Sequence, residues 1–107
     1  MGKIYLGTEL KLNVNIDPIG DNHMSNYDWK VELFTTPNKV VTVESTDVNN
    51  AICQDADNYI IKVDTTNIGV GKLKCRVTAY IPDADFPDYK RTEIQLYNPN
   101  IDIIRAD

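Results

Sequence analysis

The stretch LKCRVTAYI, residues 73–81, decides the fold class. Apolar residues occupy its odd-numbered positions, whereas the residues between them include Lys74, Arg76 and Thr78. Successive side chains of a β-strand point to opposite faces, so a period of two is typical of a strand with one buried face. The stretch therefore predicts a half-buried strand in a β-rich domain.

The same period of two recurs on both sides of this stretch. In residues 10–16 and 27–33, four apolar or aromatic residues alternate with polar ones. Shorter apolar segments lie at 4–6, 40–43, 59–63 and 92–96, with a weaker strand at 51–54 and a short tail at 101–104. Clusters of Pro, Gly, Asn and Asp separate these segments, and no helical stripe is present. The pattern predicts an all-β fold, an antiparallel β-sandwich of seven to eight strands, in one domain over residues 1–107.

Three segments resemble parts of immunoglobulin domains. Residues 7–12 are similar to the start of an immunoglobulin B strand, and Trp29 lies near the start of the next strand, where such domains place a core tryptophan. Residues 64–75 resemble the corner between the E and F strands, a polar turn with glycines followed by a strand. The resemblance implies an immunoglobulin-like sandwich.

The two cysteines depart from the immunoglobulin pattern. Leu12 and Val14 stand opposite Cys75 where a second cysteine would be required, and Cys53 lies on a different segment. We therefore expect no inter-sheet disulfide and expect Cys75 to be a small core hydrophobe. Leu73 stands where the corner tyrosine would be, so the hydrogen bond of that tyrosine is missing too.

The charge balance excludes several classes of partner. The chain has 16 acidic and 11 basic residues and a formal net charge of −5. An acidic domain has no electrostatic reason to bind nucleic acid or an anionic membrane, so neither is expected as a partner. No apolar stretch approaches the roughly 18 residues needed to cross a bilayer. A strand pattern starts at Ile4, so no signal peptide is expected within this sequence.

No catalytic or metal-binding motif is recognisable. His23 is the single histidine and is expected to be an ordinary surface residue, and there is no GxSxG, HExxH or phosphate-binding loop. Asp55 and Asp57, like Asp83 and Asp85, have the D-x-D spacing that calcium can use, but the glycine and glutamate of an EF-hand loop are missing. The sequence predicts a protein that is not an enzyme and has neither cofactor nor metal site.

Two loops contain the candidate binding residues. In an immunoglobulin-like topology, residues 17–25 and 82–89 would be the B–C and F–G loops, which meet at one pole. Acidic side chains beside apolar ones can form a contact patch for a basic partner. The alternative is that Phe86 folds under its own loop and the aspartates cap turns. The candidate residues are Ile19, Asp21, Met24, Asp83, Asp85, Phe86, Asp88 and Tyr89.

Two other surfaces are possible. Tyr59, Tyr80 and Tyr97 could line a sheet face as sugar-binding aromatics do, although a cross-strand pair of Tyr80 with Tyr97 is the simpler interpretation. Residues 39–44 could form an exposed edge strand that adds a strand of a partner protein.

The stretch GVGKLKCRVTAYIPDADFPD, residues 69–88, resembles small proteins encoded among the structural genes of phages and prophages of gut Bacteroides-type bacteria. Residues 4–8, 10–12, 91–93 and 101–104 fit the same resemblance. It implies a virion component that decorates a head, supports a fibre or joins tail parts. Its partners would be other virion proteins or further copies of itself, and it would assemble in the cytoplasm of the bacterial host.

Two functions from other classes remain open. A secreted carbohydrate-binding or adhesion module would need a leader removed ahead of this chain and a row of solvent-facing rings. A cytoplasmic protein-binding adaptor would use an exposed sheet edge. Genes for portal, capsid or tail proteins next to this one would favour the virion hypothesis over both.

Overall fold

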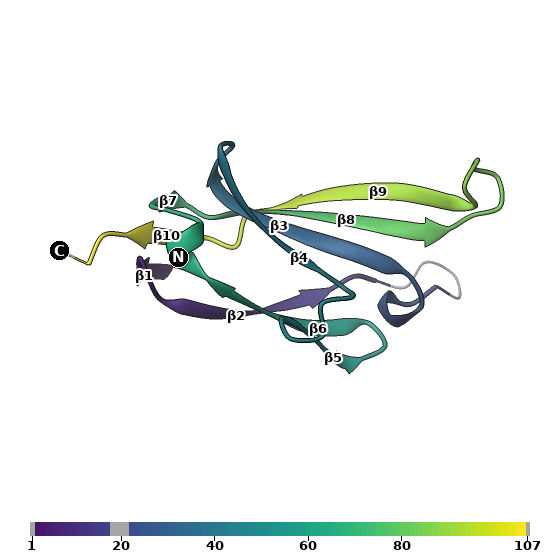
Figure 1. The fold of residues 1–107 in the computed structure, drawn as a ribbon, viewed down its shortest axis with the longest axis horizontal. Helices are drawn as coiled ribbons and strands as arrows, with labels where there is room; N and C mark the ends of the chain where they lie inside the picture. Colours follow the sequence, from purple (N-terminus) through teal and green to yellow (C-terminus); the bar gives the residue numbers. More distant parts are fainter. Residues whose placement is uncertain (1, 18–21, 107) are drawn as a thin grey trace.

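The computed structural model describes residues 2–17 and 22–106. Within these residues the chain forms ten β-strands in three sheets, two short 3₁₀ turns and no α-helix (Figure 1). The all-β class is confirmed. The strand number exceeds the seven to eight predicted, because two short strands and the tail pair as a sheet of their own.

The larger layer is a four-stranded antiparallel sheet in the order β4-β3-β8-β9. Its strands are β3 (Asp28–Thr36), β4 (Lys39–Glu44), β8 (Lys74–Pro82) and β9 (Lys90–Tyr97). Figure 1 shows this layer above the second one, with the β8–β9 turn at the opposite end of the molecule from β1 and β10. Strands β4 and β9 are its two edges.

The smaller layer is an antiparallel sheet in the order β2-β6-β5. Its strands are β2 (Glu9–Asn15), β5 (Ala51–Asp55) and β6 (Asn58–Asp64). The weak segment predicted at 51–54 is therefore a true strand, a hairpin partner of β6. The free edges of this layer are β2 and β5.

A third sheet joins the ends of the chain. Strand β10 (Ile101–Ile104) pairs parallel with β1 (Gly2–Tyr5) and antiparallel with β7 (Gly71–Lys72). The backbone of Asn100 has φ 59°, a left-handed conformation that asparagine tolerates, and it redirects the chain from β9 into β10. The predicted tail is thus a paired strand, and the parallel pair departs from the all-antiparallel expectation.

The core lies between the two larger layers and follows the predicted alternation. Trp29 is 1% exposed, and its ring meets the Tyr59 ring edge-on, with centroids 4.9 Å apart and an interplanar angle of 78°. Leu12 and Val14 of β2 pack against this core from the second layer. The fully buried side chains include Met24, Trp29, Val31, Leu33, Ile61, Thr65, Ile68, Leu73, Ile81 and Ile103.

The strand predicted at residues 73–81 forms as β8 but begins one residue later, because β7 (Gly71–Lys72) belongs to the third sheet and β8 begins at Lys74. Between them, the backbone N–H of Leu73 donates to the carbonyl of Ile101 at 2.9 Å. The chain changes from one sheet to another at this residue while the Leu73 side chain stays in the core.

The tyrosine pair predicted from the sequence does not form. In the β8–β9 register, Tyr80 lies opposite Thr92, and Tyr97 lies opposite Cys75. Tyr80 and Tyr97 are therefore at opposite ends of the hairpin, and Tyr59 belongs to the other layer. The interpretation of these residues as a cross-strand pair was wrong, because neighbouring strands do not by themselves place two residues in register.

The two thiols differ in accessibility, and both are free. Cys75 is buried as predicted, and burial raises the pKa of its thiol to about 11, whereas Cys53 is exposed. Because the thiolate is the reactive form, we expect iodoacetamide at a pH of about 8 to modify Cys53 alone in the native protein. Intact-mass spectrometry should show one adduct per native chain and two in denaturant. Two adducts on the native chain would contradict the buried position of Cys75, and a Cys53→Ser control should show none.

Candidate interaction surface

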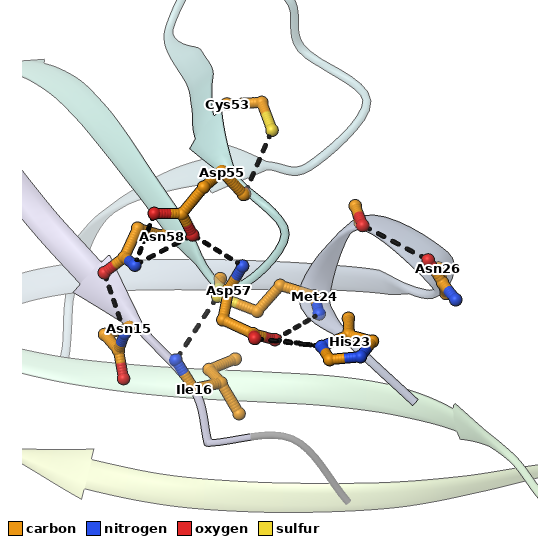
Figure 2. A network of polar contacts seen from close by, with 10 residues as sticks. Asn15, Ile16, His23, Met24, Asn26, Cys53, Asp55, Asp57 and Asn58 are labelled. Carbon is orange, nitrogen blue, oxygen red and sulfur yellow. Dashed lines mark hydrogen bonds and ion pairs between the residues drawn. The ribbon is translucent and has the colours of Figure 1, made fainter. Parts of the chain in front are cut away.

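The described part of the first candidate loop packs against the turn between β5 and β6 (Figure 2). The backbone N–H of Ser25 donates to the carbonyl of Ala56 at 3.0 Å. Nδ1 of His23 lies 2.9 Å from one carboxylate oxygen of Asp57, and the backbone N–H of Met24 donates to the other at 3.3 Å. These contacts hold a 3₁₀ turn, η1 (Met24–Asn26), against the smaller layer.

This packing corrects one prediction and adds to another. Met24 is fully buried, and its sulfur accepts a hydrogen bond from the backbone N–H of Ile16 at 3.3 Å, so it belongs to the core and not to a contact patch. The side chain of His23 is 40% exposed, as expected of a surface residue, but it also pairs with Asp57 and so helps to hold the turn. The predicted residues Ile19 and Asp21 lie outside the described residues.

The second candidate loop, residues 83–89, is a capped turn at the end of the β8–β9 hairpin. Asp83 accepts hydrogen bonds from the backbone N–H of Asp85 and from Nη1 of Arg91, both at 3.0 Å. Phe86 and Tyr89 are 43% and 70% exposed. Asp85 and Asp88 are exposed as well. The first aspartate thus caps the turn, as the simpler interpretation predicts, while the two rings remain at the surface.

The structure does not bring the two loops together through side-chain contacts. In the described residues, no side-chain hydrogen bond or ion pair joins 22–26 to 82–89. Residues 22–26 bond to the β5–β6 turn instead. Asp57 lies in that turn, which is not one of the two candidate loops.

Asp55 and Asp57, one of the two D-x-D pairs, lie at the turn between β5 and β6 and stabilise it. Asp55 accepts hydrogen bonds from the backbone N–H of Asp57 at 3.0 Å and from the side-chain amide of Asn58 at 2.9 Å. These bonds, the backbone bond above all, lower the pKa of Asp55. No group of three or more His, Cys, Asp or Glu side chains in residues 2–17 and 22–106 is arranged to hold a metal ion.

The most exposed apolar surface on any strand lies on β9, at an edge of the larger layer. Ile94, Leu96 and Tyr97 are 60%, 75% and 51% exposed. Ile94 and Leu96 lie opposite Thr78 and Arg76, on the outer face of the sheet, whereas Tyr97 lies opposite the buried Cys75, on the inner face. The sequence pattern predicted this strand but not the exposure of Ile94 and Leu96, because the same alternation is typical of residues that face the core.

An apolar groove of about 270 Å³ lies beside this edge. It runs between the two layers, where the free edges of β2 and β9 leave the core partly uncovered. Its apolar lining comes from Leu12, Val14, Ile16, Val31, Cys75, Val77, Tyr97 and Pro99. We call this groove and the outer residues Ile94 and Leu96 the β9 edge.

The opposite edge of the larger layer is better protected. Strand β4 contacts β6 and the 3₁₀ turn η2 (Thr65–Asn67), and Nζ of Lys39 donates to the carbonyl of Thr66 at 3.2 Å. Its pairing with β3 shifts register between Phe34 and Thr36, whereas the β8–β9 pairing is regular from Cys75 to Pro82. Irregular pairing and cover by neighbouring elements are the usual protection of an edge strand, so β9 is the edge more open to strand addition.

The outer face of the larger layer carries one well-formed ion pair. Arg76 donates to the two carboxylate oxygens of Glu32 from Nε at 3.0 Å and from Nη2 at 2.8 Å, and its guanidinium lies 5.5 Å from the centre of the Phe34 ring. The hydrogen bonds from Arg76 hold the pKa of Glu32 below its usual 4.5. The ion pair links β3 to β8 on the outer face of the larger layer, and β9 lies beside β8 in the same layer.

The lowered pKa of Glu32 makes part of the stability acid-sensitive. A carboxylate whose pKa is lower in the folded chain stabilises it fully above the unfolded value of about 4.5, and this stabilisation is lost as the pH falls through the folded value. We expect the thermal midpoint to fall as the pH drops below about 4.5, and to fall less in Glu32→Gln. Circular dichroism melts across this range measure the effect, with the exposed β2 residue Glu9→Gln as the control. Equal pH profiles for the wild type and Glu32→Gln would contradict it.

No helix among the described residues is long and apolar enough to cross a membrane. Comparison with protein-family models, with curated proteins and with solved structures found no match to this chain.

Proposed function

We propose that this chain is a non-enzymatic interaction module with an immunoglobulin-like fold that serves as a component of a phage virion. The observation that carries the interaction role is the β9 edge, where exposed aliphatic side chains on a free strand adjoin an apolar groove. An edge strand with unpaired backbone groups and neighbouring apolar pockets is a common recognition mode for proteins.

The strand order supports the immunoglobulin-like fold. With β2, β3, β5, β6, β8 and β9 taken as strands B, C, D, E, F and G, one layer has the order B-E-D and the other contains C-F-G. Strand β4 then adds to C as an extra edge strand. Trp29 on β3 packs in the core, as the tryptophan of strand C does in immunoglobulin domains. Strand β1 pairs with β10 and leaves β2 uncovered, which is what opens the groove.

The virion role rests on the resemblance of residues 69–88, together with 4–8, 10–12, 91–93 and 101–104, to small phage-encoded proteins. The physical properties of the chain are compatible with that role. A small acidic domain with a regular exposed edge suits a repeated part whose partners are proteins.

Purified particles of the phage or prophage that encodes the chain provide the test. We expect mass spectrometry to find this protein in the same density-gradient fractions as the capsid protein, at a fixed ratio that survives washing. Recovery only in the particle-free or host-envelope fractions would overturn the virion role. A particle-bound protein whose occupancy is unchanged by Leu96→Lys would overturn the role of the β9 edge, with Val48→Lys, on an exposed loop, as the matched control.

A further inference from the structure

We infer that the occupant of the β9 edge is a second copy of this chain, paired antiparallel along β9 about a two-fold axis at Ile94. This inference rests on the proposed interaction role and names its partner. It would join the two four-stranded sheets into one sheet of eight strands.

The residue pattern of β9 is complementary to itself in one register. In an antiparallel pair, residues directly opposite each other lie on the same face of the sheet. The two-fold axis must therefore pass through one residue of β9, because only then do the buried faces of both sheets lie on the same side. With Ile94 at the centre, Thr92 lies opposite Leu96 and Arg91 lies opposite Tyr97 of the second copy. Glu93 then lies opposite Gln95, so no like charges meet.

The neighbouring registers are worse. A centre at Glu93 places the two Glu93 carboxylates directly opposite each other, which is destabilising. A centre at Gln95 places Arg91 opposite Pro99, which cannot donate to a strand ladder. The Ile94 register uses seven residues of β9, from Arg91 to Tyr97, without either conflict.

Such a pairing would cover the apolar surface that the single chain exposes. On the outer face, Ile94 and Leu96 of both copies would form one continuous apolar strip. On the inner face, the guanidinium of Arg91 would lie beside the Tyr97 ring of the second copy, a cation next to an aromatic face. The grooves of the two copies would then face each other across the joined edge.

The dimer is expected to depend on concentration. Seven paired residues of strand span about 24 Å, and one paired edge buries less than the roughly 800 Å² per partner of a standard stable interface. Sedimentation equilibrium of the full chain should show a mass rising from 12.1 kDa toward twice that value with concentration.

Matched variants locate the interface. We expect Leu96→Lys to weaken the dimer by about tenfold or more, because it places charge in the apolar strip, whereas Val48→Lys should leave it unchanged. Both replaced side chains are exposed, so both variants should melt like the wild type. In a Cys53→Ser background, Ile94→Cys should form a covalent dimer on mild oxidation, since each new thiol lies opposite its own copy, whereas Thr92→Cys should not.

Two results would overturn the inference. One is a monomer mass at every concentration up to about 1 mM, where even very weak specific dimers form. The other is a dimer that Leu96→Lys does not weaken. A monomeric chain that is still found in particles would refute this inference alone, whereas a β9 dimer that is absent from particles would support it and refute the virion role.

Discussion

Trp29→Ala should be among the most damaging truncations in this chain. We expect it to lower the free energy of unfolding by about 3 to 5 kcal/mol, because it removes a buried aromatic side chain and leaves a cavity. Trp29 is 1% exposed and lies on β3, opposite Ala79, with the Tyr59 ring of the other layer against it. The side chain therefore joins the two layers. A loss of this size is a large share of the total stability of a small domain, about 5 to 15 kcal/mol.

Urea unfolding followed by far-ultraviolet circular dichroism measures this loss without depending on tryptophan fluorescence. Trp29→Phe is the matched control, since it keeps a ring in the same space and should cost less. Val48→Ala, on an exposed loop, should change the stability by less than about 0.5 kcal/mol. A loss below about 1 kcal/mol for Trp29→Ala would show that the two layers do not share the core described here.

Thr65→Val should also destabilise the fold, because it removes a buried hydroxyl that bonds two parts of the chain. Oγ1 of Thr65 donates to the carbonyl of Thr8 at 2.8 Å and accepts from the backbone N–H of Gly7 at 2.9 Å. Thr65 is fully buried in η2, and Gly7, with φ 99°, lies in the turn between β1 and β2. Valine has a similar shape but leaves the Gly7 N–H without its partner.

The expected cost is about 1 to 3 kcal/mol, the penalty for a buried polar group that has lost its hydrogen bond. Thr65→Ser keeps the hydroxyl and should recover most of this loss, so the difference between the two variants reports the hydrogen bonds rather than the methyl group. Urea unfolding again provides the measurement. Equal stabilities of the valine and serine variants would show that the hydrogen bonds between η2 and the β1–β2 turn do not stabilise the fold.

The period-two pattern predicted the parts of the fold in which one face of a strand is buried. Leu10, Leu12 and Val14 point toward the core, as do Trp29 and Val31. The pattern carries this information because exposure alternates along a strand in the same way as polarity. It also predicted Cys75 as a buried free thiol, since no cysteine stands opposite it.

Pairing between distant segments could not be predicted in the same way. The tail at 101–104 carries too few residues to show a period, and its parallel partner β1 lies at the other end of the chain. The break at Leu73 leaves the alternation intact, because the residue changes sheets without changing its buried face. The burial of Met24 depends on the contact of η1 with Asp57, which no local pattern indicates.

The candidate surface was the least predictable part. The acidic loop residues were recognisable from the sequence, but Asp83 and Asp55 bond to their own turns. Exposure of Ile94 and Leu96 depends on the register of β9 against β8 and on the absence of a further strand beside β9 in the described chain. An alternating apolar pair looks the same whether it faces the core or the solvent.

If the protein interacts through β9 and not through the opposite edge, β4, assembly should protect the β9 backbone from solvent. Hydrogen exchange followed by mass spectrometry compares the isolated chain with the assembled state. We expect assembly to slow exchange in the peptide that covers residues 90–97 and to leave residues 39–44 unchanged. Slowed exchange at residues 39–44 with no change along β9 would contradict this expectation.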